Sequence, residues 1–185
     1  MSSEEDLIYY ELLVLRCRRG DRDALEEMVR HWERRLLYYL RRLLGDEDDV
    51  WDVLQETWVT AFGGIKTLRE PRTLPVWLYR IARNRAMTKL RGKYSDREFI
   101  QQEDSGLETI PEPSESLSFE DAEQIHYGLA KISPPHREVL TLHFLDDLSI
   151  DDIAEVLGAP GGTVKSRLHF AKKALRTVIE QEEAA

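Results

Sequence analysis

The sequence predicts an all-α protein made of two small helical domains and an acidic linker between them. Apolar residues recur at spacings of three and four along most of the chain, and no stretch alternates in the manner of a β-strand. The periodicity fades over residues 94–117, where serine, glutamate, aspartate and proline accumulate as in flexible tethers. The 185 residues suffice for two helical domains of roughly 60 to 90 residues. We expect these domains at residues 7–93 and 118–180.

The composition predicts a folded protein without a disulfide, a metal site or a membrane span. Hydrophobic residues make up 42% and charged residues 33% of the chain, which argues against extensive disorder. The single cysteine, Cys17, excludes an internal disulfide and a cysteine-built zinc site, and the five histidines never pair at metal-ligand spacing. No apolar run approaches the ~18 residues of a membrane helix, and residues 1–6 do not resemble a signal peptide. We expect a cytoplasmic protein that needs no cofactor.

The net charge of −9 is concentrated in one segment. Residues 95–123 hold ten acidic side chains and one basic one, which accounts for the whole excess. Two other segments are basic: residues 78–93 carry six basic side chains and residues 163–176 carry five, with no acid in either. This distribution favours nucleic-acid binding in spite of the acidic total.

Four helices are predicted in the N-terminal half, each bounded by residues that favour a helix end. The apolar stripe of the third helix ends at Phe62, and Gly63-Gly64 then breaks the pattern. A loop over residues 65–74 leads to the fourth helix, for which Pro75 suits the first turn. The four predicted helices cover residues 7–19, 21–45, 48–62 and 75–91.

In the C-terminal half, helical order resumes at Ser118, where Ser118 and Asp121 resemble a capping pair. Pro134 and Pro135 mark a break, after which a further short helix is expected around Val139. The last two predicted helices cover residues 150–157 and 161–179.

These last two helices have the layout of a helix-turn-helix. Ser149 can cap the first with Asp152, and Gly158 permits the turn. The second helix has one apolar stripe and an outward face that is polar and basic, which is what reading of the major groove requires. A helical hairpin with a solvated basic face is the alternative. The apolar stripe consists of Val164, Leu168, Ala171 and Leu175.

The run GAPGGTVKSRLHFAKKAL, preceded by ISPPHREVLTLHFLDDLSIDDIAEVL, resembles the helix of sigma factors that recognises the promoter −35 element. DDVWDVLQETWVTAF followed by LPVWLYRIARNRAMTKLR resembles the polymerase-binding helix and the −10 helix of the same family. Together the two matches cover roughly residues 8–93 and 122–180. The chain is thereby identified as similar to the extracytoplasmic-function (ECF) subfamily of the sigma-70 family, and the resemblance implies a transcription initiation factor rather than an enzyme.

The resemblance implies two sites for promoter DNA. On the fourth helix, an aromatic ring, an amide and cations share one face, which suits capture of an unpaired base beside its phosphates. Asn84 and the loop 65–74 would hold a base flipped from the non-template strand. The phosphate contacts or supports of this site would be Arg80, Arg83, Arg85 and Lys89. The predicted −10 residues are Trp77, Arg80, Arg83, Asn84, Thr88 and Arg91. The predicted −35 residues are Thr163, Lys165, Ser166, Arg167, His169, Phe170 and Lys173.

The resemblance also implies protein partners: core RNA polymerase, through its clamp coiled coil and flap, and an anti-sigma factor. The residues expected to bind polymerase face away from the apolar stripe of the third helix or lie at its margin. They are Trp51, Asp52, Gln55, Glu56 and Val59.

Several of these assignments have a plainer alternative. Trp77 could fill core near a helix start, and an exposed acidic helix face is more often only solvated. The acidic segment could be a solubilising tether, or it could discourage DNA contact until the domains spread apart. A signal-responsive regulator with a C-terminal helix-turn-helix is the main rival, although it has no need of the basic, aromatic fourth helix. No nucleophile elbow, phosphate-binding loop or paired carboxylates suggest an enzyme or a small-molecule substrate.

The sequence departs from the family pattern at four places. Phe170 stands where an arginine is usual, so a contact with a thymine methyl could replace one to phosphate or guanine. Thr88 stands where an aspartate is common, and glycines occupy positions 63, 64, 161 and 162. These changes affect the expected promoter sequence more than the role.

Overall fold

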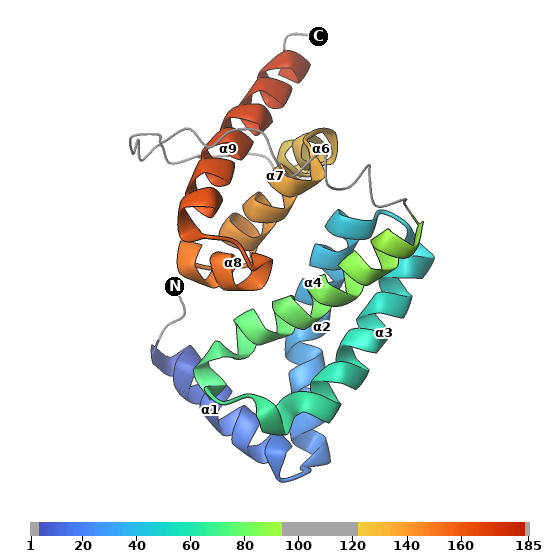
Figure 1. Cartoon of the computed structure of the whole chain (residues 1–185), viewed down its shortest axis with the longest axis vertical. Helices are drawn as coiled ribbons and strands as arrows, with labels where there is room; N and C mark the ends of the chain where they lie inside the picture. Colours follow the sequence, from blue (N-terminus) through green and yellow to red (C-terminus); the bar gives the residue numbers. More distant parts are fainter. Residues whose placement is uncertain (1–3, 94–121, 184–185) are drawn as a thin grey trace.

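The computed structural model describes residues 4–93 and 122–183, and it confirms the all-α prediction. Figure 1 shows two groups of helices that lie against each other. Within the described residues no strand occurs, and no helix is long and apolar enough to cross a membrane. The N-terminal domain contains α1 (Glu4–Arg18), α2 (Arg22–Leu44), α3 (Glu47–Gly64) and α4 (Leu74–Lys93). The C-terminal domain contains α6 (Ala122–Lys131), α7 (Pro134–Leu140), α8 (Ile150–Leu157) and α9 (Gly161–Glu183).

Helix α2 is the central element of the N-terminal domain. The Asp21 side chain caps its start by accepting from the Ala24 amide, and Gly45 ends it with a φ of 73°, which favours glycine. One side of α2 is buried against α1, α3 and α4. Its fully buried side chains include Met28, Trp32, Leu36 and Tyr39.

Helix α3 continues two residues beyond its predicted end at residue 62. Gly63 and Gly64 remain helical because a glycine costs only about 1 kcal/mol in a helix interior. Gly64 also lies beneath the Trp77 ring, where a Cβ would be 3.4 Å from a ring carbon. Two 3-10 turns, Ile65–Thr67 and Pro71–Thr73, then replace the predicted irregular loop. Phe62 was expected in the buried stripe but is 37% exposed and stacks on Trp58.

The C-terminal domain contains the predicted helix-turn-helix. Ser149 and Asp152 form a capping box at the start of α8, and Gly158 turns the chain with a φ of 64°. The predicted apolar stripe of α9 is buried. Helix α7 continues into a π-helical turn at Thr141–Leu145, which leads to α8. Helix α6 packs closely on α9, because a Cβ at Gly128 would be 2.5 Å from a Leu175 methyl.

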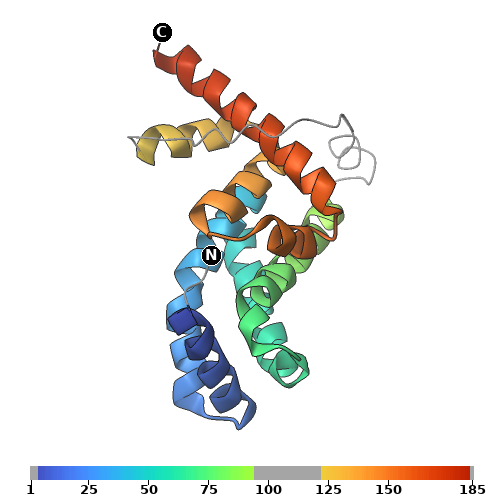
Figure 2. The same ribbon diagram turned by 90° about the vertical axis from the view of Figure 1, so that its left-hand side faces the viewer.

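The two domains pack directly on each other. Helix α7 contacts α2, and α8 contacts α4, as Figure 2 shows from a second direction. The predicted linker, residues 94–117, and the predicted Ser118–Asp121 cap lie outside the described residues.

Candidate nucleic-acid interface

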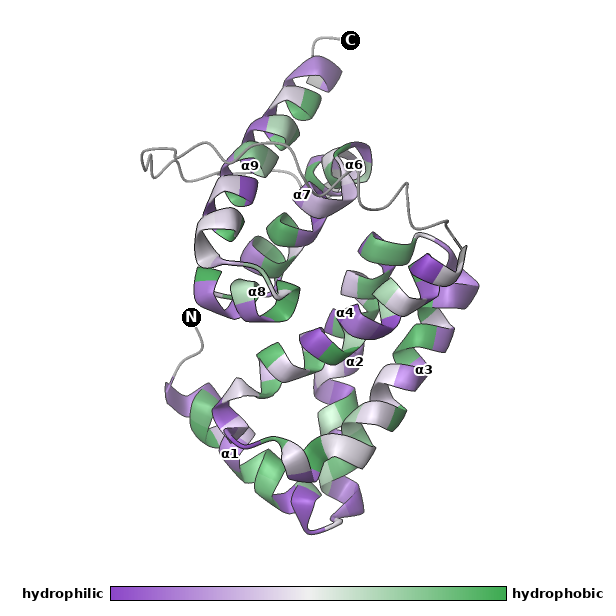
Figure 3. Cartoon of the chain, in the orientation of Figure 1, coloured by the Kyte–Doolittle hydropathy of each residue, from purple (hydrophilic) through white to green (hydrophobic). Residues whose placement is uncertain are grey.

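Helix α4 presents a polar face to solvent and an apolar face to the core. In Figure 3, hydrophilic and hydrophobic positions alternate along this helix. Leu78, Ala82, Ala86 and Leu90 are buried on the apolar face. On the opposite face Trp77 is half-buried, and the other residues of the predicted stripe are exposed: Arg80, Asn84, Thr88 and Arg91. The structure therefore places an aromatic ring, an amide and two guanidinium groups along one surface.

Two further cations of α4, Arg85 and Lys89, are held by α3. Lys89 lies 3.0 Å from Asp52 and 3.2 Å from Asp49, and hydrogen bonds to these carboxylates raise its pKa. Arg85 donates to the Thr60 hydroxyl at 2.9 Å. Both contacts fasten α4 to α3.

Arg83 differs from the other predicted −10 residues because it turns toward the C-terminal domain. Its guanidinium donates to Glu138 of α7 at 2.9 Å, and its side chain is only 14% exposed. Arg80, although exposed, lies 3.7 Å from Glu155 of α8. Carboxylates of the C-terminal domain thus contact two of the six side chains predicted to meet the −10 element.

The segment between α3 and α4 is anchored by α1. Ile65 and Leu68 are buried, whereas Lys66, Thr67 and Arg69 are exposed. Arg18 of α1 donates to the backbone carbonyls of Ile65 and Leu68, and Arg72 donates to Glu11 of α1 at 2.7 Å. Helix α1 therefore holds this segment beside the start of α4, an anchoring that the sequence reasoning missed.

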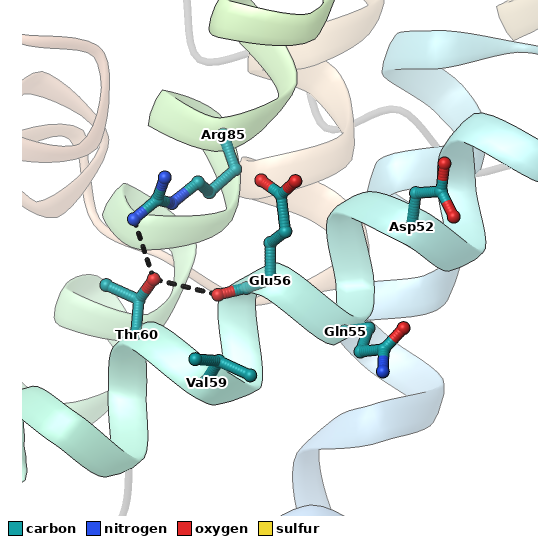
Figure 4. A pocket seen from close by; sticks show the side chains of 6 residues that line it. All are labelled: Asp52, Gln55, Glu56, Val59, Thr60 and Arg85. Atoms are coloured by element: carbon teal, nitrogen blue, oxygen red, sulfur yellow. Dashed lines mark hydrogen bonds between the residues drawn. The ribbon is translucent and has the colours of Figure 1, made fainter.

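The outer face of α3 carries all the residues predicted to bind polymerase. Trp51 is 48% exposed and Val59 is 68% exposed. Figure 4 shows the open hollow that this face forms with α4. It is lined by Asp52, Gln55, Glu56, Val59, Thr60 and Arg85. A surface with exposed apolar groups and acidic neighbours suits a protein partner with basic residues.

The second helix of the helix-turn-helix, α9, carries the other candidate DNA surface. Lys165 and Lys173 are exposed, and Thr163, Ser166 and Arg167 are partly exposed around them. His169 and Phe170 form an edge-to-face pair with ring centroids 5.5 Å apart. All seven predicted −35 residues are thus at least partly accessible on one helix of the domain.

Two further contacts fix the surroundings of α9. The Lys172 ammonium lies 5.2 Å from the centre of the Phe144 ring, which favours a cation–π interaction. His136 of α7 is partly buried, and its pKa is lowered by this burial and by the nearby Arg167 guanidinium. Within the described residues no group of three or more histidine, cysteine, aspartate or glutamate side chains could hold a metal ion.

Comparison with known protein families gives two matches. The model for "Sigma-70 region 2" matches residues 28–95, and the model for "Sigma-70, region 4" matches residues 122–175. The first match contains α3 and α4, and the second contains the helix-turn-helix.

Curated relatives match over almost the whole chain. The ECF RNA polymerase sigma factor SigW of Bacillus subtilis is 30% identical, covering 88% of this chain and 92% of its own. The sigma-H factor of Pseudomonas aeruginosa is 30% identical over 97% of this chain and 96% of its own. The ECF sigma-E factor of Escherichia coli K12 is 31% identical over 92% and 94%.

Solved structures share the fold. CnrH in complex with the cytosolic domain of CnrY has a TM-score of 0.66 at 22% identity, covering 92% of this chain and 96% of that one. RpoE in complex with the anti-sigma factor NepR from Bartonella quintana has a TM-score of 0.64 at 22% identity, covering 84% and 96%. The suspected resemblance is confirmed: the chain belongs to the sigma-70 family of transcription initiation factors, in its ECF subfamily.

Proposed function

We propose that this chain binds core RNA polymerase, recognises the −35 and −10 elements of a promoter, and promotes strand opening. The observation that carries the proposal is the pair of cationic helix faces on separate domains. One lies on the second helix of a helix-turn-helix, and the other combines cations with an aromatic ring and an amide. The first kind of surface suits the major groove of duplex DNA, and the second suits a separated strand. The domain boundaries that we propose are residues 7–93 and 118–180, with an acidic tether at 94–117.

On this proposal the outer face of α4 receives the −10 element. Asn84 is exposed near the middle of the face and can hydrogen-bond the edge of a base that has left the stack. Trp77 offers part of its ring for stacking, while Arg80 and Arg91 lie within the same stripe to contact phosphates. The exposed side chains of the segment between α3 and α4 would complete the pocket for the flipped base.

The −35 element would lie along the N-terminal part of α9. Helix-turn-helix proteins place the second helix in the major groove, and its first turns meet the base edges. Lys165, Arg167 and Lys173 would contact phosphates or guanine, and Ser166 and His169 can hydrogen-bond bases. Phe170, partly exposed beside His169, offers an apolar contact to a thymine methyl.

Core polymerase would bind the outer face of α3 through its clamp coiled coil. Exposed Trp51 and Val59 supply apolar contact area, and Gln55 and Glu56 supply polar contacts. The flap of the polymerase would bind the C-terminal domain. An anti-sigma factor is the remaining proposed partner, because one structural neighbour, RpoE of Bartonella quintana, is a sigma factor in complex with an anti-sigma factor.

Transcription with purified components tests the proposal. The full chain, mixed with bacterial core polymerase and the DNA upstream of its own gene, should start transcription at one defined position. Footprinting should then show protection at both promoter elements. Absence of any binding to core polymerase would refute the proposal.

A matched pair of variants locates the polymerase site. Val59→Arg places a charge on the outer face of α3 and should weaken core binding at least tenfold, as expected when a charge enters the apolar centre of an interface. Leu12→Arg makes the same change at an exposed apolar residue of α1, which is 57% exposed. It should leave core binding unchanged. Equal effects of the two substitutions would argue against the α3 site.

A further inference from the structure

The segment between α3 and α4 has an inner and an outer side. Ile65 and Leu68 are buried in the core of the domain, whereas Lys66, Thr67 and Arg69 are exposed between and beside them. The exposed side chains are two cations and a hydroxyl, which can contact phosphates or base edges of a nucleic acid. The way in which the inner residues are held therefore decides how the outer ones are presented.

The backbone of this segment needs hydrogen-bond partners beyond its own two turns. A 3-10 turn of three residues satisfies few of its carbonyl groups internally. Two carbonyls accept from nearby threonine hydroxyls: Thr67 donates to Gly64 at 2.7 Å, and Thr73 donates to Glu70 at 2.8 Å. The carbonyls of the two buried residues instead accept from a side chain of another helix.

Arg18, the last residue of α1, supplies that side chain. Its guanidinium donates to the Leu68 carbonyl and, at 3.5 Å, to the Ile65 carbonyl. A guanidinium holds its N–H donors in a rigid planar fork, so two bonds from one group fix two carbonyls relative to each other. Arg18 is also partly buried, and a hydrogen bond shielded from water is stronger than an exposed one.

The anchored end of the segment touches the −10 helix. Gly64, the residue before Ile65, lies beneath the Trp77 ring, where a Cβ would be 3.4 Å from a ring carbon. A shift of the backbone at Ile65 would therefore also change the support of this ring. The Arg18 side chain thus acts on the exposed part of the segment and on the aromatic ring of α4.

A second contact between α1 and the segment is weaker. Arg72 donates to Glu11 of α1 at 2.7 Å, but the two side chains are 52% and 37% exposed. Exposed ion pairs contribute little, because water and salt screen them. Arg18, whose acceptors belong to buried residues, is therefore the main link between α1 and the segment.

We propose that Arg18 is a positioning residue for selection of the flipped base. Its hydrogen bonds hold the inner side of the segment, so that residues 66, 67 and 69 and the Trp77 ring keep one arrangement before DNA arrives. A site held in its binding geometry discriminates better than one that must be ordered on binding. Arg18 acts through these groups and does not itself touch the strand. The inference rests on the −10 role proposed above for α4 and this segment.

Direct contact with DNA and positioning predict different results for Arg18. If its cation met a strand phosphate, its loss would weaken binding of every base equally. The slope of log affinity against log salt would then become shallower by about 0.7, as expected for one phosphate of a single strand. If Arg18 holds the segment, its loss lowers the ratio of affinities between bases and leaves the slope nearly unchanged.

The experiment uses holoenzyme assembled from bacterial core polymerase and the full chain in four forms: wild type, Arg18→Met, Arg18→Lys and Arg16→Met. The probes are forked duplexes of the promoter upstream of its own gene, with an unpaired non-template −10 strand. They differ only at the base that a fluorescent analogue shows to leave the stack. Competition binding gives the affinity for each of the four bases, at two salt concentrations.

Wild type should prefer one base at this position by at least about tenfold. Arg18→Met keeps the apolar stem but loses the donors, and should lower this preference at least about threefold, because a displaced site fits the correct base less well. Arg18→Lys keeps the charge without the fork and should fall between the two. Arg16→Met removes the ion pairs with Asp21 and Glu27 at the same end of α1 and should keep the wild-type preference.

Hydrogen exchange without DNA tests the anchoring itself. In Arg18→Met the amides of residues 65–69 should exchange about tenfold faster than in wild type, while those of α2 and α3 keep their rates. Circular dichroism checks that each variant keeps its helices. Arg18→Lys keeps the test valid if Arg18→Met does not fold.

Positioning by Arg18 is refuted if Arg18→Met keeps the wild-type preference, or if it weakens binding of all four bases equally with a shallower salt slope. Equal losses of preference in Arg18→Met and Arg16→Met would assign the effect to the stability of α1 and would also refute it. In each of these cases the −10 role of α4 stands. If wild type itself opens the promoter without distinguishing the four bases, the proposed base pocket fails, and the role of Arg18 fails with it.

Discussion

The two candidate DNA surfaces differ in what covers them. The polar face of α4 meets carboxylates of the other domain at Arg80 and Arg83, and the second of these contacts is almost fully buried. Helix α9 packs through its apolar stripe on α6, α7 and α8 of its own domain and leaves Lys165 and Lys173 exposed. Access to separated strand thus depends on the arrangement of the domains, whereas access to duplex depends mainly on one domain.

The largest effect is expected at the buried contact of α4. Arg83→Met leaves the Glu138 carboxylate buried without its cation, which should destabilise the packing of the two domains by about 3 kcal/mol. Arg80→Met removes a contact whose two side chains are more than half exposed, and should cost less than about 1 kcal/mol. Hydrogen exchange of the α7 amides in the full chain would measure both. Similar exchange rates in the two variants would show that the buried contact does not hold the domains together.

The next effect concerns the exposed amide of α4. Asn84→Ala should reduce promoter opening about tenfold to a hundredfold, because a hydrogen-bonded base contact contributes about 1–3 kcal/mol. Binding to core polymerase and to −35 duplex should be unchanged, since Asn84 lies on neither surface. Opening is measured with a fluorescent base in the −10 element, and Thr177→Ala on α9 serves as the control. Normal opening by the Asn84 variant would remove this residue from the site.

The sequence could predict features that depend on residues close together in the chain, but not the contacts between the two domains. Each helix face follows from residues three and four apart, so the exposed stripe of α4 and the buried stripe of α9 were predictable from local spacing. The capping pair Ser149 and Asp152 gave the start of α8, because a capping box is also a local pattern. The predicted end of α3 at residue 62 was wrong. A glycine pair weakens a helix but does not end it where a neighbour such as Trp77 packs on it.

No local pattern in the sequence indicates the contacts between the two domains. Tyr39 and Glu138 are 99 positions apart in the chain, and Glu138 occurs in a stretch whose sequence predicted only a short helix. The family resemblance implied that Arg83 is a phosphate contact or a support, and its carboxylate partner comes from the other domain. A pattern along one helix cannot show which of its polar residues a distant helix will cover. The roles of the individual site residues stay predictions.

A smaller effect is expected on the recognition helix, where no opening is needed. Phe170→Arg restores the guanidinium usual in the family and should tighten binding to −35 duplex by about 1 kcal/mol at low salt. If the new side chain meets one phosphate, the slope of log affinity against log salt should become steeper by about 0.9. Thr177→Arg adds the same charge two turns further along α9 and should change the slope less. Equal slopes in both variants would place Phe170 away from the DNA.

The smallest effect is a pH dependence of the domain packing through Asp146. Its pKa is raised by burial to about 6 in the packed form, whereas an exposed aspartate titrates near 3.8. The packed form therefore binds one more proton between these values, and packing is stabilised as the pH falls through 6 and weakened as the pH rises through it. From pH 7 to pH 5 the gain is about 1 kcal/mol. The groups that face Asp146 are Tyr79, Arg35 and Asp147.

Scattering at the two pH values should show greater compaction at pH 5 in wild type, and Asp146→Asn should abolish most of the change. If the pH dependence of compaction persists in Asp146→Asn, another titrating group causes it. If wild type shows no pH dependence, the protonation of Asp146 is not coupled to the packing of the domains.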